Sequence, residues 1–360
     1  MSLEWFPCPG TASRTGDELC AHLGEIVVLV HRTASAPRPG SEYRAAAAKP
    51  RCLPDLSRFA GPGRTLRILF VTKIGVEGTG SYGAGLARHP RRVGVEVIEV
   101  DRPNRQKRRS AGKSDPLDAV EAARAALGGR AVGRPKSRDG AVEAIRVLVV
   151  AKRSARQARV KALLQMRHLG YSAPEQLRCR LKCLSVPALV AEGAKLRPTR
   201  SPDPVTAATK ASLSSLAHRI EALDRELAEL DERIEALLVA TVPDLLDLFG
   251  VGPDTAAALV TAAGDNPERL RSEAAWAHLC GVAPVPDGSG KTSGRVKAHD
   301  GGDRQANSAL WRIVMVRIAH DPETRLYFDR RVKEGKTKHE VIRILKRYVA
   351  REVYRYLPRG

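Results

Sequence analysis

The chain has 360 residues, a formal net charge of +21 and a sequence pI near 10.2. This length allows two or three domains, and so positive a charge indicates a nucleic-acid partner or, less often, an acidic membrane surface. A soluble protein whose arginine content reflects a GC-rich genome is the alternative. No apolar run is long enough to cross a bilayer, and the first residues lack a signal-peptide layout. The six cysteines show neither zinc nor disulfide spacing, so we expect a reducing, cytoplasmic location.

Residues 1–65 are expected to be atypical and poorly ordered. Pro, Arg, Ala and Gly dominate this segment, and such a composition buries too little apolar surface to form a core. One short apolar run, from Ile26 to Val30, is compatible with a strand.

Alternating strand and helix patterns begin at residue 66 and indicate an α/β unit. Residues 66–77 (LRILFVTKIGVE) and 93–100 (VGVEVIEV) are rich in β-branched and aliphatic residues, which predicts two buried strands. A glycine-rich turn and a short helix separate them. A basic loop over 101–114 and a helix over 115–127 follow.

Three carboxylates in this unit are candidate metal ligands. Glu77 follows the first strand, and Asp115 and Asp118 lie three residues apart on one face of a helix start. Such a set can hold Mg²⁺ against phosphate oxygens, as in two-metal phosphoryl transfer. Each residue also has a structural interpretation. Ser114-Asp115-Pro116 is an ordinary helix start, and Glu77 can simply be a polar residue leaving a strand.

Basic residues are concentrated in the loop after the second strand and in a helix expected over residues 141–169. The helix carries its cations at helical spacing beside an apolar stripe. Runs of this kind bind nucleic-acid phosphates without specifying sequence, and solvated charge is the alternative. The candidate phosphate contacts are Arg102, Arg105, Lys107, Arg108, Arg109 and Lys113 in the loop, and Lys152, Arg153 and Arg156 in the helix.

The clearest periodicity lies in residues 213–237. Apolar residues recur there in alternating steps of three and four, with Glu, Asp and Arg between them. This pattern predicts a coiled coil or a long helical hairpin, and an ordinary amphipathic helix is the alternative. We call these residues the seam: Leu213, Leu216, Ile220, Leu223, Leu227, Leu230, Ile234 and Leu237.

Residues 243–265 read as helix, tight glycine turn and helix. The turn GVGPDTA, with Gly250 and Gly252, resembles a helix-hairpin-helix, in which backbone N–H groups and the next helix N-terminus approach a phosphate. The alternative is a plain helical hairpin in which glycine caps the first helix.

A polar loop rich in glycine and serine lies near residue 290. Ser289 and Ser293 stand beside Lys291 and Arg295, and a serine flanked by cations can attack a phosphodiester because the cations stabilise the added negative charge. A polar surface loop is the alternative. The SGK tripeptide is not a P-loop, because the glycine spacing that precedes a P-loop lysine is absent.

Taken together, these segments resemble one family, the DEDD-type insertion-sequence transposases of the "one-ten" insertion-sequence family. The resemblance runs from residue 74 to residue 357 in the family's order. The motifs that carry it are GVEGTGSYGAGLARH, EVDRPNRQ, GKSDPLDA, GVGPDTAAAL, GVAPVP, SGKTSGR and GGDRQAN.

The resemblance implies a resolvase-type, RNase H-like nuclease domain, a coiled-coil connection and a C-terminal transposase domain with a nucleophilic serine. By position, Glu77, Asp115 and Asp118 match family acids that bind Mg²⁺. Ser289 matches the serine that links covalently to DNA, with Ser293 as the fallback. The implied partners are the DNA of the element ends and target, a structured guide ("bridge") RNA, and further copies of the chain joined through the coiled coil. The implied location is bacterial and nucleoid-associated.

One departure concerns the N-terminus. Family members begin with a strand such as VGIDVHK, which carries the first acid, and residues 1–73 contain no such strand. The α/β nuclease-like domain is therefore expected to be incomplete. A non-catalytic nucleic-acid-binding remnant and a resolvase-like nuclease acting through carboxylates alone stay open as alternatives. The expected divisions are an atypical segment (1–65), the nuclease-like domain (66–175), a linker with coiled coil (176–240) and a mainly α-helical transposase domain (241–360).

Overall fold

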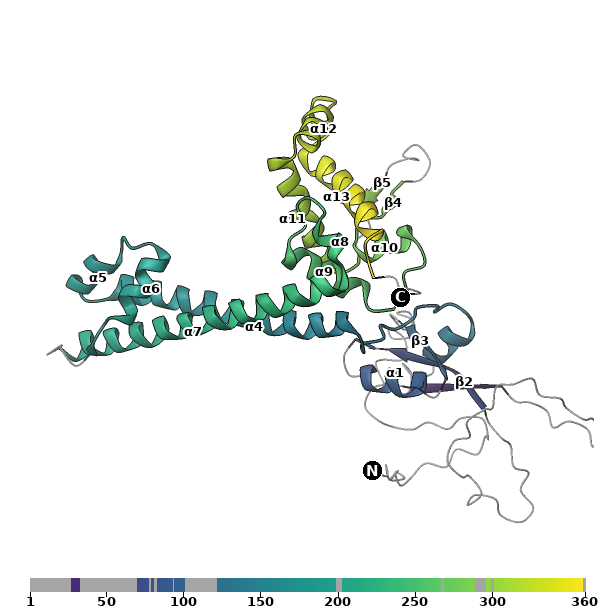
Figure 1. Ribbon diagram of the computed structural model, residues 1–360, viewed down its shortest axis with the longest axis horizontal. Helices are drawn as coiled ribbons and strands as arrows, with labels where there is room; N and C mark the ends of the chain where they lie inside the picture. Colours follow the sequence, from purple (N-terminus) through teal and green to yellow (C-terminus); the bar gives the residue numbers. More distant parts are fainter. Residues whose placement is uncertain are drawn as a thin grey trace, which may run out of the picture. The chain divides into compact units, whose positions relative to one another are not determined.

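The computed structural model describes part of the chain, in two compact units that divide between Lys136 and Ser137 (Figure 1). Apart from one strand, the segment expected to be poorly ordered lies outside the described residues. The described ranges are 27–32, 70–77, 79–80, 83–92, 94–100, 122–198, 203–266, 269–288, 296–298 and 301–358.

A three-stranded sheet organises the first unit. Its strands are β1 (Val27–Arg32), β2 (Phe70–Glu77) and β3 (Glu96–Val100), in the order β1-β2-β3. β2 and β3 are parallel, and helix α1 (Gly83–Arg92) supplies the crossover that parallel neighbours require. The two strands expected from apolar runs are thus present, and the short N-terminal run forms β1, antiparallel to β2.

The sheet buries aliphatic side chains against helices. Ile74, Val76 and Val97 form a small core with Ala87 of α1. Residues 122–127 are helical, and a Cβ added at Gly75 would lie 2.7 Å from the carbonyl oxygen of Ala122. Glycine in β2 therefore permits this helix to approach the sheet closely.

Two long antiparallel helices, which we call the stalk, begin the second unit. They are α4 (Ala141–Ser172) and α7 (Pro204–Thr241). Lys152 pairs with Asp231, and Arg159 pairs with Asp224, so positions rise along α4 as they fall along α7. Two short helices join them at the far end, α5 (Glu175–Leu181) and α6 (Val186–Ala194) (Figure 1). The seam thus forms one side of a helical hairpin within a single chain.

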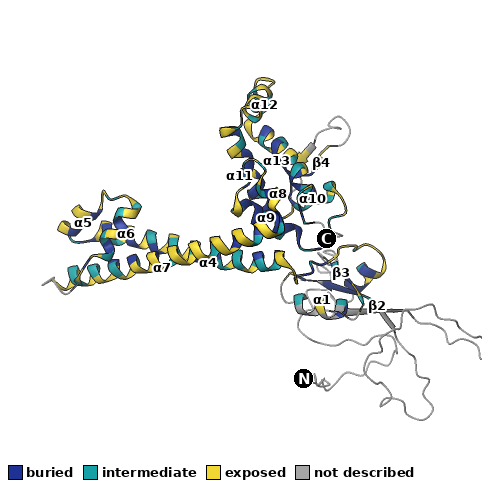
Figure 2. Ribbon diagram, in the orientation of Figure 1, coloured by how far each residue is buried: buried dark blue, intermediate teal, exposed yellow. Residues whose placement is uncertain are grey.

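Burial along the stalk is uneven (Figure 2). Leu213 and Ile220 join an apolar cluster with Met166 at the far end, and Ile234 joins the core of the C-terminal region. Between these clusters, the seam leucines are only partly buried, because α4 is the helix that covers them and a two-helix pair leaves one side open. These leucines are Leu223, Leu227 and Leu230. The helix expected to belong to the nuclease-like domain, α4, lies in the second unit.

A mainly helical domain completes the second unit, as the sequence predicts for the C-terminal half. Its core contains Trp276, Leu310 and Ile313, each with no exposed surface. The only strands in the described part of this unit form a short antiparallel pair. The elements are α8 (Pro243–Leu246), α9 (Pro253–Ala263), α10 (Glu273–Leu279), β4 (Pro284–Pro286), β5 (Val296–Ala298), α11 (Arg304–His320), α12 (Pro322–Lys333) and α13 (Lys338–Tyr354).

None of the described helices combines the length and the apolar character needed to span a membrane.

Candidate nucleic-acid interface

The structure places one of the predicted acids at a strand end. Glu77 is the last residue of β2 and lies opposite Val100, the last residue of β3, at the carboxyl edge of two parallel strands. Its side chain lies outside the description. Among the described residues, no group of three or more His, Cys, Asp or Glu side chains is placed to hold a metal ion. The other predicted residues outside the described ranges are Asp115, Asp118, Arg102, Arg105, Lys107, Arg108, Arg109, Lys113, Ser289, Lys291, Ser293 and Arg295.

The glycine turn before α9 is closed by hydrogen bonds to Thr255, a side chain in the first turn of α9. Gly250 has a φ of 82°, a conformation that favours glycine, and Gly252 is the N-cap of α9. The Gly252 N–H donates to Thr255 Oγ1 at 3.0 Å, and the Thr255 hydroxyl donates to the Gly252 carbonyl at 2.8 Å. Thr255 therefore occupies an N–H group that a phosphate-binding turn would offer to a ligand.

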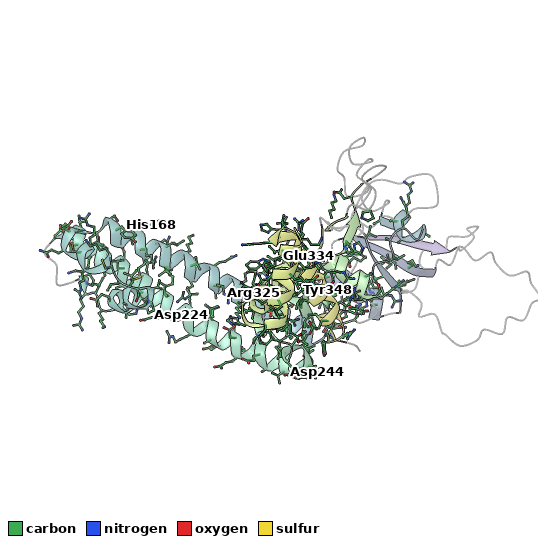
Figure 3. The ribbon with its side chains drawn as sticks, turned by 90° about the horizontal axis from the view of Figure 1, so that it is seen from above. His168, Asp224, Asp244, Arg325, Glu334 and Tyr348 are labelled. Carbon is green, nitrogen blue, oxygen red and sulfur yellow. The ribbon has the colours of Figure 1, made fainter. Side chains whose placement is uncertain are left out.

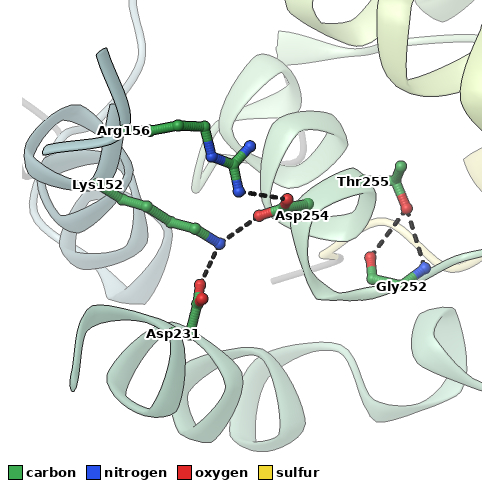
Figure 4. Close-up of polar contacts among 6 residues, drawn as sticks. All are labelled: Lys152, Arg156, Asp231, Gly252, Asp254 and Thr255. Atoms are coloured by element: carbon green, nitrogen blue, oxygen red, sulfur yellow. Dashed lines mark hydrogen bonds and ion pairs between the residues drawn. The ribbon is translucent and has the colours of Figure 1, made fainter. Parts of the chain in front are cut away.

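A buried lysine joins this turn to the stalk (Figure 4). The Lys152 ammonium group pairs with Asp231 of α7 and Asp254 of α9, and its side chain is only 9% exposed. Arg156 adds a second contact to Asp254 at 3.2 Å. Two carboxylates thus neutralise Lys152, one of the expected phosphate contacts, and make it a link between three helices.

The same contacts set the ionisation of Asp254. Burial by itself would raise the pKa of this carboxyl group. The hydrogen bonds and positive charges of Lys152 and then Arg156 outweigh burial, so the pKa of Asp254 is lower than usual. Asp254 is consequently a carboxylate at neutral pH, and a negative charge in the first turn of α9 disfavours a phosphate at that position.

The remaining cations of α4 differ in their partners. Arg153 is exposed, and no described carboxylate pairs with it. Arg159 pairs with Asp224 on α7, partway along the stalk (Figure 3). That hydrogen bond raises the pKa of the Arg159 guanidinium. Of the predicted contacts on α4, Arg153 is therefore the one most available to a phosphate.

A second polar arrangement lies where α11 begins. Asp303 is the N-cap of α11, and its carboxylate accepts from the N–H groups of Gln305 and Ala306 at 2.8 and 3.0 Å. One turn later, the Asn307 amide donates to the carbonyl oxygens of Cys280 and Gly281 at 2.8 and 3.1 Å. These bonds fix the start of α11 against the turn after α10.

A side chain from α13 completes this arrangement. Lys346 donates to the Asn307 side-chain oxygen at 2.7 Å. Burial, followed by the charge of Arg343, lowers the pKa of Lys346. An open pocket of about 300 Å³ lies beside it, between α11, α13 and the segment at Gly301. In the sequence, the lining segment that begins at Gly301 follows three residues after β5 ends at Ala298.

Sequence reasoning missed this pocket. Arg304, Ser308 and Trp311 line it and lie at steps of four and three, on one face of α11. The seven-residue spacing of Arg304 and Trp311, which places them on one face of a helix, was a signal available in the sequence. Lys346 gave no such signal, because it is 39 residues away from Asn307.

Comparison with known proteins shows that part of this chain is similar to a family of transposases. Residues 243–329 match the family model described as Transposase IS116/IS110/IS902 family. Over 137 residues, 38% of the chain, the protein is 31% identical to the "Insertion element IS900 uncharacterized 42 kDa protein" of Mycobacterium paratuberculosis, 34% of which is covered. Over 130 residues, 36% of the chain, it is 33% identical to the "Insertion element IS110 uncharacterized 43.6 kDa protein" of Streptomyces coelicolor, 32% of which is covered.

These matches concern part of each protein. The aligned region spans about a third of the length of either curated relative. The family match runs from α8 into α12 and encloses both the serine loop and the α11 side of the pocket. Residues 243–329 of this chain are therefore similar to the family described as Transposase IS116/IS110/IS902 family.

Proposed function

We propose that the protein is the transposase of an insertion sequence, which cuts DNA strands and rejoins them through a serine nucleophile. The observation that carries the proposal is the family match over residues 243–329, because it encloses the loop with Ser289. Cutting and rejoining DNA is the activity that a transposase family implies in general, and the high positive charge suits a DNA partner.

The chemistry assigned to Ser289 is a phosphoryl exchange. The serine oxygen attacks a backbone phosphorus, a serine–phosphate bond forms, and the bond to one strand's sugar oxygen breaks while that oxygen takes up a proton. A sugar hydroxyl from another strand then attacks the same phosphorus and releases the serine, so the number of phosphodiester bonds is conserved. Lys291 and Arg295 stabilise the negative charge of both transition states.

The carboxylates serve as the second part of the proposed site. Glu77, Asp115 and Asp118 offer oxygen ligands of the kind that Mg²⁺ prefers, and Glu77 ends β2 at the edge from which the loop toward both aspartates departs. A bound Mg²⁺ would neutralise phosphate charge and orient a strand for attack. The sheet would help to position these carboxylates, because the ends of β2 and β3 fix the place of Glu77 and the point where the loop after Val100 begins.

The basic residues indicate the proposed nucleic-acid partners, and the partly buried leucines of the stalk indicate further copies of the chain as partners. The basic loop over 101–114 and Arg153 contact backbone phosphates of DNA and of a structured guide RNA. Copies of the chain associate through the partly buried leucines of the seam, which a further helix would cover. These activities take place in the bacterial cytoplasm, at the nucleoid.

A strand-exchange assay tests the proposal. The purified chain is incubated with paired element ends, guide RNA and Mg²⁺, and covalent protein–DNA species and rejoined strands are measured. Ser289→Ala is expected to abolish both products. Ser293→Ala is the matched control and is expected to retain them. If Ser289→Ala formed as much of both products as Ser293→Ala, the role assigned to Ser289 would be refuted.

A non-catalytic nucleic-acid-binding protein is the second candidate, and one observation favours it. β1 has the sequence VVLVHR, with no acid at either end, so the described strand beside β2 does not supply the first carboxylate of the family pattern. This candidate predicts unchanged DNA binding with no product in the assay. Mg²⁺-dependent cutting that survives Ser289→Ala would instead indicate a resolvase-like nuclease.

A further inference from the structure

Two cations, one at the start of α11 and one in α13, lack the carboxylate partners that several other cations of this unit have. Arg317, Arg347 and Lys152 each pair with an acid. Lys346 and Arg304, which line the pocket, pair with no carboxylate of the described residues. The one carboxylate in the lining, that of Asp303, is engaged in capping α11. The pocket therefore presents positive charge to a ligand.

Holding Lys346 in this place has a cost that an anion would offset. The lysine is half-buried, and its only described hydrogen bond is to the neutral amide oxygen of Asn307. Burial lowers the pKa of Lys346, which means that the protein leaves its charge poorly compensated. An ammonium group held by a fixed neutral partner at the edge of a pocket is suited to a charged hydrogen bond with phosphate.

The aromatic wall of the pocket is also unusual. Trp311 is 47% exposed, whereas Trp276, the other described tryptophan, is fully buried in the core. Trp311 thus leaves much of its surface exposed, and it lines the pocket. Bases stack on such surfaces without regard to sequence.

The backbone of the pocket is held in place by close contacts. Gly302 has a φ of 95°, and a Cβ there would lie 2.5 Å from the Leu279 carbonyl oxygen and 2.6 Å from the Gly281 nitrogen. Asp303 N–H donates to the Leu279 carbonyl at 2.6 Å. The cations and the ring are therefore presented by a fixed frame, so that little ordering is needed when a ligand enters.

We propose that this pocket binds one nucleotide of a nucleic-acid strand, with its phosphate on Lys346 and Arg304 and its base stacked on Trp311. The volume of about 300 Å³ is at the lower end of the range for ligand pockets, which suits a single unit rather than a duplex. The inference rests on the proposed function and deepens it, because it names a holding site for a strand that the protein handles.

Fluorescence titration tests the pocket without requiring turnover. Full-length Ser289→Ala protein without Mg²⁺ is titrated with DNA and RNA single strands of about ten nucleotides, within the usual site size for such strands. Affinity is followed by anisotropy of a labelled strand, and stacking is followed by quenching of tryptophan. Quenching is expected in the parent protein and is expected to be lost in Trp311→Phe, which retains affinity because phenylalanine also stacks.

Matched variants separate the pocket from the general positive charge. Trp311→Ala is expected to weaken strand binding about fivefold or more. Leu326→Ala, which removes another exposed apolar side chain on α12, is expected to change nothing. Lys346→Met is expected to weaken binding about fivefold and to reduce the salt slope by about one. Lys333→Met makes the same charge change on an exposed residue outside the pocket and is expected to have a much smaller effect.

Several outcomes would overturn the proposal. If both variants of each matched pair lost the same amount of affinity, the binding would be explained by non-specific attraction to the positive charge of the protein. Binding of inorganic phosphate that depends on Lys346, together with strand binding that is indifferent to Trp311, would leave an anion site and no nucleotide site. If Lys346→Met fails to fold, Arg304→Gln and Trp311→Ala at exposed positions still decide the matter.

The DNA and RNA arms identify the strand, and either preference supports the pocket. Failure of the proposed function is distinguishable from failure of the pocket. A chain that is inactive in the strand-exchange assay but still shows Trp311-dependent quenching would refute the proposed function and leave the pocket proposal intact.

Discussion

Removing the charge of Lys152 is expected to destabilise the second unit much more than removing the charge of Arg159. The two cations lie two helical turns apart on α4, and each pairs with an aspartate of α7. Lys152 is 9% exposed and also holds Asp254 of α9, whereas Arg159 is 30% exposed and holds Asp224 alone. The pair of variants Lys152→Met and Arg159→Met therefore compares a buried link with a surface ion pair on one scaffold.

The expected magnitudes follow from solvent access. Breaking a buried ion pair costs about 3–5 kcal/mol, because a charge is left without a partner. The carboxylates left by Lys152→Met are 52% and 40% exposed, so water can solvate them in part, and we expect a loss of about 1–3 kcal/mol. For Arg159→Met we expect about 0.2–1 kcal/mol, the range of exposed pairs.

Urea unfolding followed by circular dichroism measures both losses from the shift in midpoint at constant slope. High salt is expected to erase the Arg159 effect and to leave most of the Lys152 effect. A double-mutant cycle of Lys152→Met with Asp254→Asn is expected to give a coupling energy of about 0.5–3 kcal/mol. Equal losses in the two single variants, or a stabilised Lys152→Met protein, would refute the assignment of Lys152 as a link between helices.

Two further predictions concern acid and a glycine. Because the folded-state pKa of Asp254 is depressed, its contribution to stability is fully present above about pH 5 and is lost as the pH falls through that pKa. Asp254→Asn is expected to be less stable at neutral pH and to show a flatter loss between about pH 5 and pH 3, measured by urea midpoints across that range. Gly302→Ala is expected to lower the thermal midpoint by several degrees, since its φ of 95° and the 2.5 Å approach to the Leu279 carbonyl both oppose a Cβ. Gly335→Ala is its control, with a similar φ of 91° and open space around the added carbon. The loss of stability in this control measures the backbone strain without the steric clash.

Local periodicity was enough to predict the long elements of the fold. β2 and β3 follow from apolar runs, and α7 follows from the seam, because side-chain spacing reports directly on strand and helix geometry. The seam left open whether its partner was another chain or another segment. The answer depended on α4, whose mixture of exposed valines and cations gave no matching heptad pattern.

Long-range contacts explain the rest of the difference. Lys152 looked like a phosphate contact because its neighbours in sequence are basic, yet its partner Asp254 is 102 residues away. The glycine turn likewise looked open, although Thr255 closes it by hydrogen bonds that its motif alone does not specify. The roles of Asn307 and Lys346 also depended on tertiary contacts, between α11, α13 and the turn at Gly281.

The position of the Lys152 link gives the stalk the geometry of a lever. Asp231 stands near one end of α7, and the 27 residues from it to Pro204 correspond to about 40 Å at about 1.5 Å per residue. A rotation of about 10° at the link therefore displaces the far end by about 7 Å. Any rotation at the link would thus give its largest displacement where α5 and α6 lie, which makes that end the sensitive place for a distance probe.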